Sequence, residues 1–237
     1  MMELNEQIGP YRLLERLGEG ASAVVYRACL TDDPGRQYAV KVTKAVWTEA
    51  DIETRVRFER EAENLSRLSH DNIVRLERFG VHRDRLYLVM ELARGMTLAQ
   101  ILASHQILDA GTAAQLFWHI ARGLDHAHQQ GILHRDIKPS NVMVCLEGLE
   151  SAVKILDFGL SRLRDARPAS ETLGTYLYMS PEQLGILPQP ADERSDLYSL
   201  GILAVELLNG RHPFAGQALR ELIHSHAAVA PVLAPET

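Results

Sequence analysis

The spacing of apolar side chains predicts strands over much of the first ninety residues. Loose alternation over 11–17 and an apolar run over 24–28 are typical of two strands. The runs 73–76 and 85–90 predict further strands. A hairpin suits the connection between the first two, because two glycines lie there.

Helical spacing replaces this pattern in two segments. From about 51 to 69, one side of a helix carries the apolar residues Val56, Ala62, Leu65 and Leu68. A longer helix is predicted from Asp109, a suitable N-cap, to Gln130, and Gly131 ends it. Its apolar positions recur at steps of three and four: Ala113, Leu116, Phe117, Ile120, Leu124 and Ala127.

The later part of the chain continues with two short strands and then helices. Apolar runs at 142–144 and 153–156 predict the strands. The segment 195–208 is apolar nearly all round, which predicts a buried helix, and 217–228 predicts an amphipathic one. Strands followed mainly by helices indicate the α+β class.

Composition and charge exclude several functions. The 237-residue chain is 46% apolar and 24% charged, as globular proteins are. Its net charge of −6 indicates no nucleic acid or anionic lipid partner. No membrane span or signal peptide is recognisable. With Cys29 and Cys145 alone, no disulfide framework is possible, and we expect a cytoplasmic protein. The ten histidines show no helical pairing that favours a metal site.

The clearest chemical pattern is the octapeptide 134–141, His-Arg-Asp-Ile-Lys-Pro-Ser-Asn. Its proline predicts a loop, because proline disrupts a helix interior. Chemistry on a phosphate requires a proton acceptor for the attacking hydroxyl, a cation for the transferring oxygens and an oxygen ligand for magnesium. Asp136, Lys138 and Asn141 supply one of each. For the octapeptide alone, a polar loop that caps a helix is the alternative interpretation.

This octapeptide resembles the catalytic loop of eukaryotic-type protein kinases, and its lysine is similar to that of the serine/threonine branch. The resemblance covers about 11–230, with the motifs in the family's order. It implies an N-lobe of antiparallel sheet and one helix over 1–92, a hinge over 93–97 and a mainly helical C-lobe over 98–237. It also implies ATP and Mg²⁺ as cofactors and a protein substrate with serine or threonine. Asp136 would then orient and deprotonate the hydroxyl, and Lys138 would steady the γ-phosphate.

The two early glycines, Gly18 and Gly20, resemble the glycine-rich loop that covers the ATP phosphates. The family's third glycine is Ala23 here, so we expect a stiffer loop that still binds. No helix follows the glycines, which counts against a dinucleotide-binding fold.

Lys41 resembles the kinase lysine that contacts the α- and β-phosphates. A lysine inside an apolar strand requires a neutralising partner. By resemblance the predicted helix 51–69 supplies it, and the spacing favours Glu61 over its neighbours Glu59 and Glu63.

The resemblance also implies contacts with the nucleoside. The backbones of Glu91 and Ala93 would pair with the adenine edge, Met90 would lie behind it, and Thr97 would face the ribose. The residues expected to contact ATP are Leu17, Gly18, Gly20, Val25, Ala39, Lys41, Met90, Glu91, Ala93, Thr97 and Met143.

Asp157-Phe-Gly follows a predicted strand sixteen residues after Asn141. An acid at a strand end suits magnesium, so Asp157 and Asn141 are the expected metal ligands. The polar segment 160–173 is predicted to be mobile. A phosphate on its Ser170 or Thr172 would supply an anion for the arginine of the octapeptide.

The segment 174–182 resembles the substrate-docking loop and the Ala-Pro-Glu motif, with serine in place of alanine as in bacterial members of the family. By resemblance Thr175 bonds Asp136 and Lys138 in the catalytic centre. Asp196 would hold the backbone of the catalytic loop in shape.

Kinase C-lobes usually continue past the equivalent of Thr237 and provide an arginine for the glutamate at 182. No arginine or lysine follows Arg220, so we expect Glu182 to be unpaired or bound by a backbone amide. We also expect a fragment with further domains after Thr237, or a truncated, self-associating form whose last helices are missing. A pseudokinase or regulatory binding module is the functional alternative, against which the intact catalytic residues speak.

Overall fold

The computed structural model describes residues 2–20, 22–46, 52–104, 108–145, 152–158 and 173–233. At 52–54, 57, 152, 173 and 175 the description is of the backbone. The chain forms two compact units. The first comprises Met1–His70 and Val74–Ala93, and the second comprises Asp71–Ile73 and the described residues from Arg94 onward.

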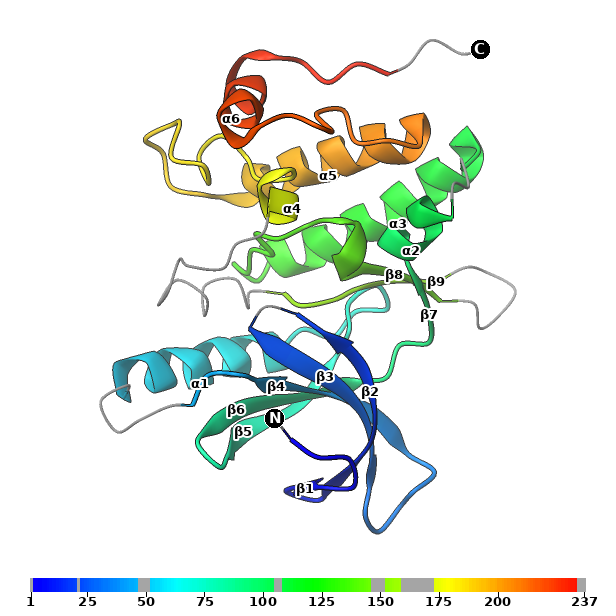
Figure 1. Ribbon diagram of the computed structural model, residues 1–237, viewed down its shortest axis with the longest axis vertical. Coiled ribbons are helices and arrows are strands. Elements are labelled where there is room, and N and C mark those ends of the chain that lie inside the picture. Colours follow the sequence, from blue (N-terminus) through cyan, green and yellow to red (C-terminus); the bar gives the residue numbers. More distant parts are fainter. Residues whose placement is uncertain are drawn as a thin grey trace. The chain divides into compact units, whose positions relative to one another are not determined.

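The first unit contains a six-stranded antiparallel sheet (Figure 1). Its strands are β1 (Gln7–Ile8), β2 (Tyr11–Glu19), β3 (Ala23–Leu30), β4 (Gln37–Thr43), β5 (Leu76–His82) and β6 (Arg85–Glu91), in the order β1-β2-β3-β4-β6-β5. Alternate residues of β3 and β4 form a buried cluster that includes Val24, Tyr26, Val40 and Val42. Burial at every second position is the expected result of the strand's period of two.

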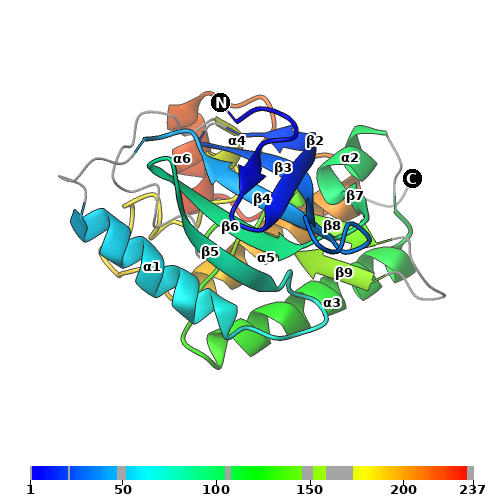
Figure 2. The ribbon, with the colours of Figure 1, turned by 90° about the horizontal axis from the view of Figure 1, so that it is seen from below.

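The helix α1 (Ile52–Ser66) packs against β5 (Figure 2). The buried Phe58 ring meets that of Phe79 edge-on, with 6.3 Å between the centroids. Positions 58, 62 and 65 share one helix face, and Ala62 and Leu65 are buried as predicted. The prediction for Val56 is wrong, because this residue points away from that face and is 57% exposed.

The predicted strand at 73–76 is also wrong. β5 begins at Leu76, and Ile73 instead forms an isolated parallel bridge with Ile155 of the second unit, to which it belongs. A run of four mostly apolar residues cannot by itself distinguish a strand from a buried connection.

The second unit joins a three-stranded antiparallel sheet to several helices (Figure 1). The sheet order is β7 (Gly95–Thr97), β8 (Val142–Cys145), β9 (Ala152–Ile155). The helices are α2 (Leu98–Ala103), α3 (Ala110–His128), α4 (Leu173–Tyr176), α5 (Glu193–Asn209) and α6 (Leu219–Ala228), with a 3-10 turn, η2 (Pro139–Asn141). The positions of β8 and β9 agree with the predicted strands. β7, α2 and α4 are too short for periodicity to indicate them.

The helix α3 closely follows its prediction. Asp109 is its N-cap and accepts a hydrogen bond from the Thr112 amide at 3.0 Å. Gly131 lies just beyond its end with a φ of 70°, a conformation that glycine adopts readily. One predicted core position is wrong, since Phe117 is 39% exposed.

The helix α5 packs against α3 and is capped at both ends. Asp192 caps its start, and Gly210 ends it in the left-handed conformation. The sequence predicted that α5 is buried on all sides. This prediction is wrong, because Leu197 and Leu208 are exposed. Nearly uniform apolarity therefore overstated the burial of α5.

Among the described residues, no helix is long and apolar enough to cross a membrane.

Candidate active site

The octapeptide 134–141 follows α3, and its first residue is fixed in the interior. His134 is buried, and its ring lies edge-on to Phe158 with 4.6 Å between the centroids. Its Nε2 is 2.7 Å from the Leu156 carbonyl, and its Nδ1 is 3.2 Å from the Asp136 amide. Because a carbonyl accepts and an amide donates, this arrangement requires the tautomer with its proton on Nε2. The ring thus orients the backbone at Asp136.

Three side chains of the octapeptide form one polar group. Lys138 Nζ lies 2.8 and 2.9 Å from the two carboxylate oxygens of Asp136. Asn141 Nδ2 donates to the Asp136 carbonyl at 2.8 Å and to its carboxylate at 3.1 Å. The Asp136 and Lys138 side chains are 8% and 15% exposed, so they are sheltered without being sealed from solvent. A carboxylate, an ammonium and an amide therefore converge here.

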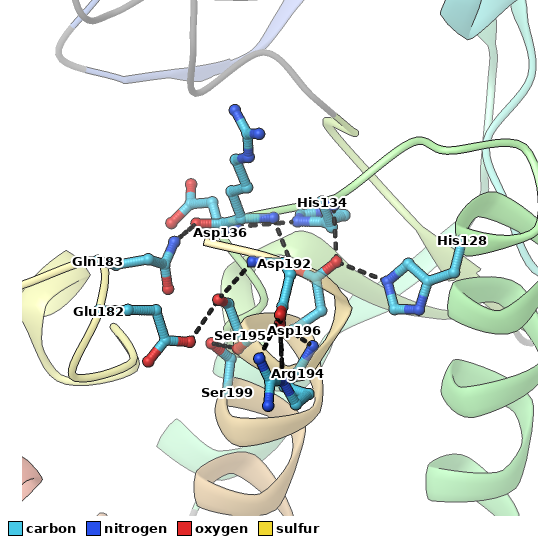
Figure 3. Close-up of polar contacts among 11 residues, drawn as sticks. His128, His134, Asp136, Glu182, Gln183, Asp192, Arg194, Ser195, Asp196 and Ser199 are labelled. Atoms are coloured by element: carbon cyan, nitrogen blue, oxygen red, sulfur yellow. Dashed lines mark hydrogen bonds and ion pairs between the residues drawn. The ribbon is translucent and has the colours of Figure 1, made fainter. Parts of the chain in front are cut away.

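A buried aspartate of α5 supports this loop (Figure 3). Asp196 accepts hydrogen bonds from the backbone amides of His134 and Arg135, at 2.8 and 2.7 Å. The Nε2 atom of His128, the last residue of α3, lies 2.8 Å from Oδ2 of the same carboxylate. The expectation that Asp196 holds the loop backbone is confirmed. His128 was not predicted as the partner of Asp196.

The backbone is strained at two residues of this region. Arg135 has a φ of 65° and Asp157 a φ of 59°, in the left-handed region that side chains disfavour. Such residues persist where their surroundings hold them, and they cluster at functional sites. The buried Nε of Arg135 has no hydrogen-bond partner among the described residues. This guanidinium is therefore available to an anion.

The expected magnesium ligands lie near one end of the β8–β9 pair. Asn141 directly precedes β8, Asp157 follows β9 closely, and Val142 pairs with Ile155 between them. Since Nδ2 of Asn141 is bound to Asp136, Oδ1 is the atom it would offer to a cation. Within the described ranges, no three His, Cys, Asp or Glu side chains cluster to hold a metal. Phosphate oxygens and water would have to complete the magnesium shell.

The expected ATP contacts of the first unit lie on adjoining strands. Val25 pairs with Lys41, and Ala39 pairs with Met90. All four residues are partly buried and face away from the buried cluster of β3 and β4, because strand neighbours alternate between faces. They therefore share one side of the sheet.

The glycine-rich segment begins on β2, which carries both Leu17 and Gly18. Gly18 pairs with Val25, and the Gly20 amide donates to the Ala23 carbonyl at 2.9 Å. A Cβ added at Gly18 would meet no atom within 4 Å. Packing within this unit therefore does not require glycine at that position.

The α1 glutamates differ in their surroundings. Glu59 forms an ion pair with Arg55 at 3.1 Å, and Glu63 is exposed. Glu61 is partly buried, next to Ala62 on the inward face. Glu59 is also partly buried, so burial alone does not select between these two, and the pairing of Glu61 with Lys41 stays a prediction.

The remaining expected nucleotide contacts lie around β6, β7 and β8. The Glu91 amide donates to the Arg75 carbonyl at 3.0 Å, and Ala93 follows in the link to β7. Thr97 caps α2, with its hydroxyl accepting from the Gln100 amide at 3.2 Å, and it pairs with Met143 of β8. Contacts of these residues with ATP stay predictions.

Glu182 has a partner that the sequence analysis did not consider. Its carboxylate accepts a hydrogen bond from the hydroxyl of Ser195, in the first turn of α5, at 2.5 Å (Figure 3). The expectation of an unpaired Glu182 is therefore wrong, whereas the alternative of a backbone amide is met in part, because the amide of Glu182 itself also donates to the carboxylate. Burial raises the pKa of Glu182, but the hydrogen bond from Ser195 and others outweigh it, so the pKa lies below its usual value.

Several predicted residues lie outside the described part of the chain. These are the glycine after Phe158, the segment 160–172 with Ser170 and Thr172, and the side chain of Thr175. Their proposed roles stay predictions.

Comparison with known proteins identifies the family that this fold and site define. Residues 11–232 match the family model described as "Protein kinase domain", so the chain belongs to the protein kinase family. Members of this family generally use ATP and Mg²⁺. The crystal structure of the Mycobacterium tuberculosis PknI kinase domain is similar, with a TM-score of 0.73 and 27% identity, covering 98% of this chain and 93% of that one. The predicted protein-kinase fold is confirmed.

Curated relatives of this chain include bacterial kinases. The serine/threonine-protein kinase pkn2 of Myxococcus xanthus is 37% identical over 230 residues, covering 94% of this chain and 27% of that protein. The serine/threonine-protein kinase PkaA of Streptomyces coelicolor is 37% identical over 235 residues, covering 93% and 42%. The chain thus spans less than half the length of these relatives.

Proposed function

We propose that this chain is the catalytic part of a serine/threonine protein kinase, which transfers the γ-phosphate of ATP to a protein hydroxyl. The observation that carries the proposal is the group of Asp136, Lys138 and Asn141, whose loop is anchored to Asp196. This group combines the proton acceptor, cation and metal ligand that phosphoryl transfer requires. The relatives' names, which specify serine/threonine kinases, support the same substrate class.

The roles follow from the distances within this group. The Asp136 carboxylate would accept the proton of the substrate hydroxyl. The hydroxyl oxygen then bonds to the γ-phosphorus, and the bond between this phosphorus and the oxygen of the leaving ADP breaks. Lys138 Nζ already lies 2.8 and 2.9 Å from that carboxylate, so a hydroxyl bound there is also near the ammonium. Its positive charge would stabilise the phosphoryl oxygens during transfer.

Cofactor binding is assigned to the residues that the resemblance to protein kinases implies. Asn141 and Asp157 would hold Mg²⁺, which neutralises charge on the phosphate oxygens when bound. Lys41, with Glu61 as its partner, would contact the α- and β-phosphates. The open space at Gly18 supports close approach of its backbone to a ligand.

Activation by phosphorylation is part of the proposal. The buried Nε of Arg135, which lacks a hydrogen-bond partner in the described chain, would bind a phosphate on Thr172 or Ser170. Mass spectrometry after incubation with ATP and Mg²⁺ should find phosphate between 160 and 173. A fully unmodified segment in an active enzyme would contradict this mechanism.

We also place the activity in the cytoplasm, which supplies ATP and keeps thiols reduced. Cys29 and Cys145, the two cysteines of the sequence, form no disulfide.

The proposed reaction is tested with radiolabelled ATP, Mg²⁺ and myelin basic protein, a generic basic substrate. After acid hydrolysis, the label should be in phosphoserine or phosphothreonine. Absence of any transfer would instead support a pseudokinase.

A further inference from the structure

Gln183 follows the Ser-Pro-Glu sequence of the segment 174–182, called the docking segment below. Its side chain bonds the catalytic loop (Figure 3) and also Ser180 of the docking segment. Its Nε2 donates to the backbone carbonyl of Arg135 at 2.8 Å. Its Oε1 accepts from both the amide and the hydroxyl of Ser180, each at 3.1 Å. The amide orientation is unambiguous, because a carbonyl can only accept and a backbone amide can only donate.

The carbonyl that Gln183 binds belongs to a strained residue. Arg135 has a φ of 65°, and its own amide is held by Asp196 at 2.7 Å. Side chains from two other segments therefore fix both backbone polar groups of Arg135. Such external restraint is what maintains an unfavourable backbone conformation.

The same carbonyl belongs to the peptide group that leads into Asp136. The amide of that peptide group contacts the His134 ring at 3.2 Å, while its carbonyl contacts Gln183. Release of the carbonyl would allow the peptide to rotate. Rotation would redirect the Asp136 carboxylate away from the position in which Lys138 and Asn141 hold it.

We propose that Gln183 is a positioning residue, which couples the conformation of the docking segment to that of the catalytic base. One amide group holds Ser180 on one side and the peptide before Asp136 on the other. Disorder in the docking segment would therefore also misalign Asp136. This inference rests on the proposed kinase function and adds a residue to which no role in the reaction was assigned.

The substitution Gln183→Glu isolates the bond to Arg135. The carboxylate has the same shape and still accepts from Ser180, but it cannot donate to the Arg135 carbonyl. At pH 8, kcat for phosphorylation of myelin basic protein should fall on the order of tenfold, the effect of leaving a sheltered partner unbonded. The KM for ATP and the thermal shift with MgATP should stay at wild-type values, because no proposed nucleotide contact changes.

Acidification distinguishes positioning from general damage. A protonated glutamic acid can again donate to the carbonyl, so the activity of Gln183→Glu relative to wild type should rise as the pH falls from about 8 to about 5.5. Gln183→Met, which has no donor at any pH, should show no such recovery. Gln7→Glu is the matched control, because it removes a similar amide-to-carbonyl bond, to Gly9 at 2.9 Å, at an exposed site in the first unit. It should keep wild-type kcat.

A Gln183→Glu enzyme with wild-type kcat at pH 8 would overturn the inference, as would a deficit that does not change with pH. In both cases the wild type remains active, so the proposed function stands. A wild-type chain that transfers no phosphate would overturn the proposed function and the inference together.

Discussion

Replacing Asp196 with asparagine perturbs the most buried anchor of the catalytic loop. Three donors lie 2.7 or 2.8 Å from its carboxylate: the amides of His134 and Arg135, and Nε2 of His128. Asparagine keeps one acceptor oxygen and places an NH₂ group against at least one donor. A hydrogen bond to a buried charge contributes about 1.5–3 kcal/mol, and an unsatisfied buried donor adds a penalty. We therefore expect the free energy of unfolding to fall by about 3 kcal/mol.

Thermal unfolding measures this loss. For a chain of this size, each kcal/mol shifts Tm by about 2–4 °C, so Asp196→Asn should lower Tm by roughly 6–12 °C. Transfer of phosphate should also fall, because the loop that carries Asp136 loses its support. Asp192→Asn is the control, since it neutralises an exposed acid in the same part of the chain and asparagine caps a helix equally well. Equal Tm values for the two variants would refute the assignment of Asp196 as the anchor.

Two further predictions concern the expected metal ligand Asp157 and the buried residue His212 of the second unit. Asp157→Ala should abolish the magnesium-dependent part of the thermal shift with ATP, because a metal ligand is lost, and an unchanged shift would exclude this role. Burial lowers the pKa of His212 to about 4, and its ring bonds the Leu177 carbonyl and the Phe214 amide at 3.0 Å each. From pH 6.5 down to 4 the unfolded state binds a proton that the folded state does not, so stability should fall by about 3 kcal/mol. His212→Gln, which does not titrate, should show a shallower fall in chemical denaturation, and parallel curves would contradict this pKa.

The local part of the site could be predicted from the sequence because its members are neighbours in the chain. Asp136, Lys138 and Asn141 lie within six residues, so one loop brings them together whatever surrounds it. The strand and helix periods likewise located β8, β9 and α3 from residues close in sequence.

Contacts between distant segments could not be predicted in this way. His128 and Asp196 are 68 positions apart, and Gln183 and Arg135 are 48 apart. No periodic pattern connects such pairs, because their contact depends on how α3, α5 and the loops pack. Glu182 illustrates the consequence, since the sequence shows only that no arginine or lysine follows Arg220, whereas the structure provides the Ser195 hydroxyl as a partner.

Periodicity also predicted which face of a helix points inward but not how deeply each residue on that face is buried. Phe117 has the spacing of a core residue of α3, yet it lies at the margin of the buried face and is exposed. Apolar spacing identifies the side of a helix, whereas burial depends on the width of the surface that covers it.

If Asp136 is the base for phosphoryl transfer, its replacement in Asp136→Asn should slow the chemical step itself. The measurement is the single-turnover rate of γ-phosphate transfer from ATP to myelin basic protein, with MgATP binding followed by thermal shift. The rate should fall by roughly 10²–10⁴, the usual contribution of a general base, with MgATP binding retained. A variant that transfers phosphate at the wild-type rate would contradict this role of Asp136.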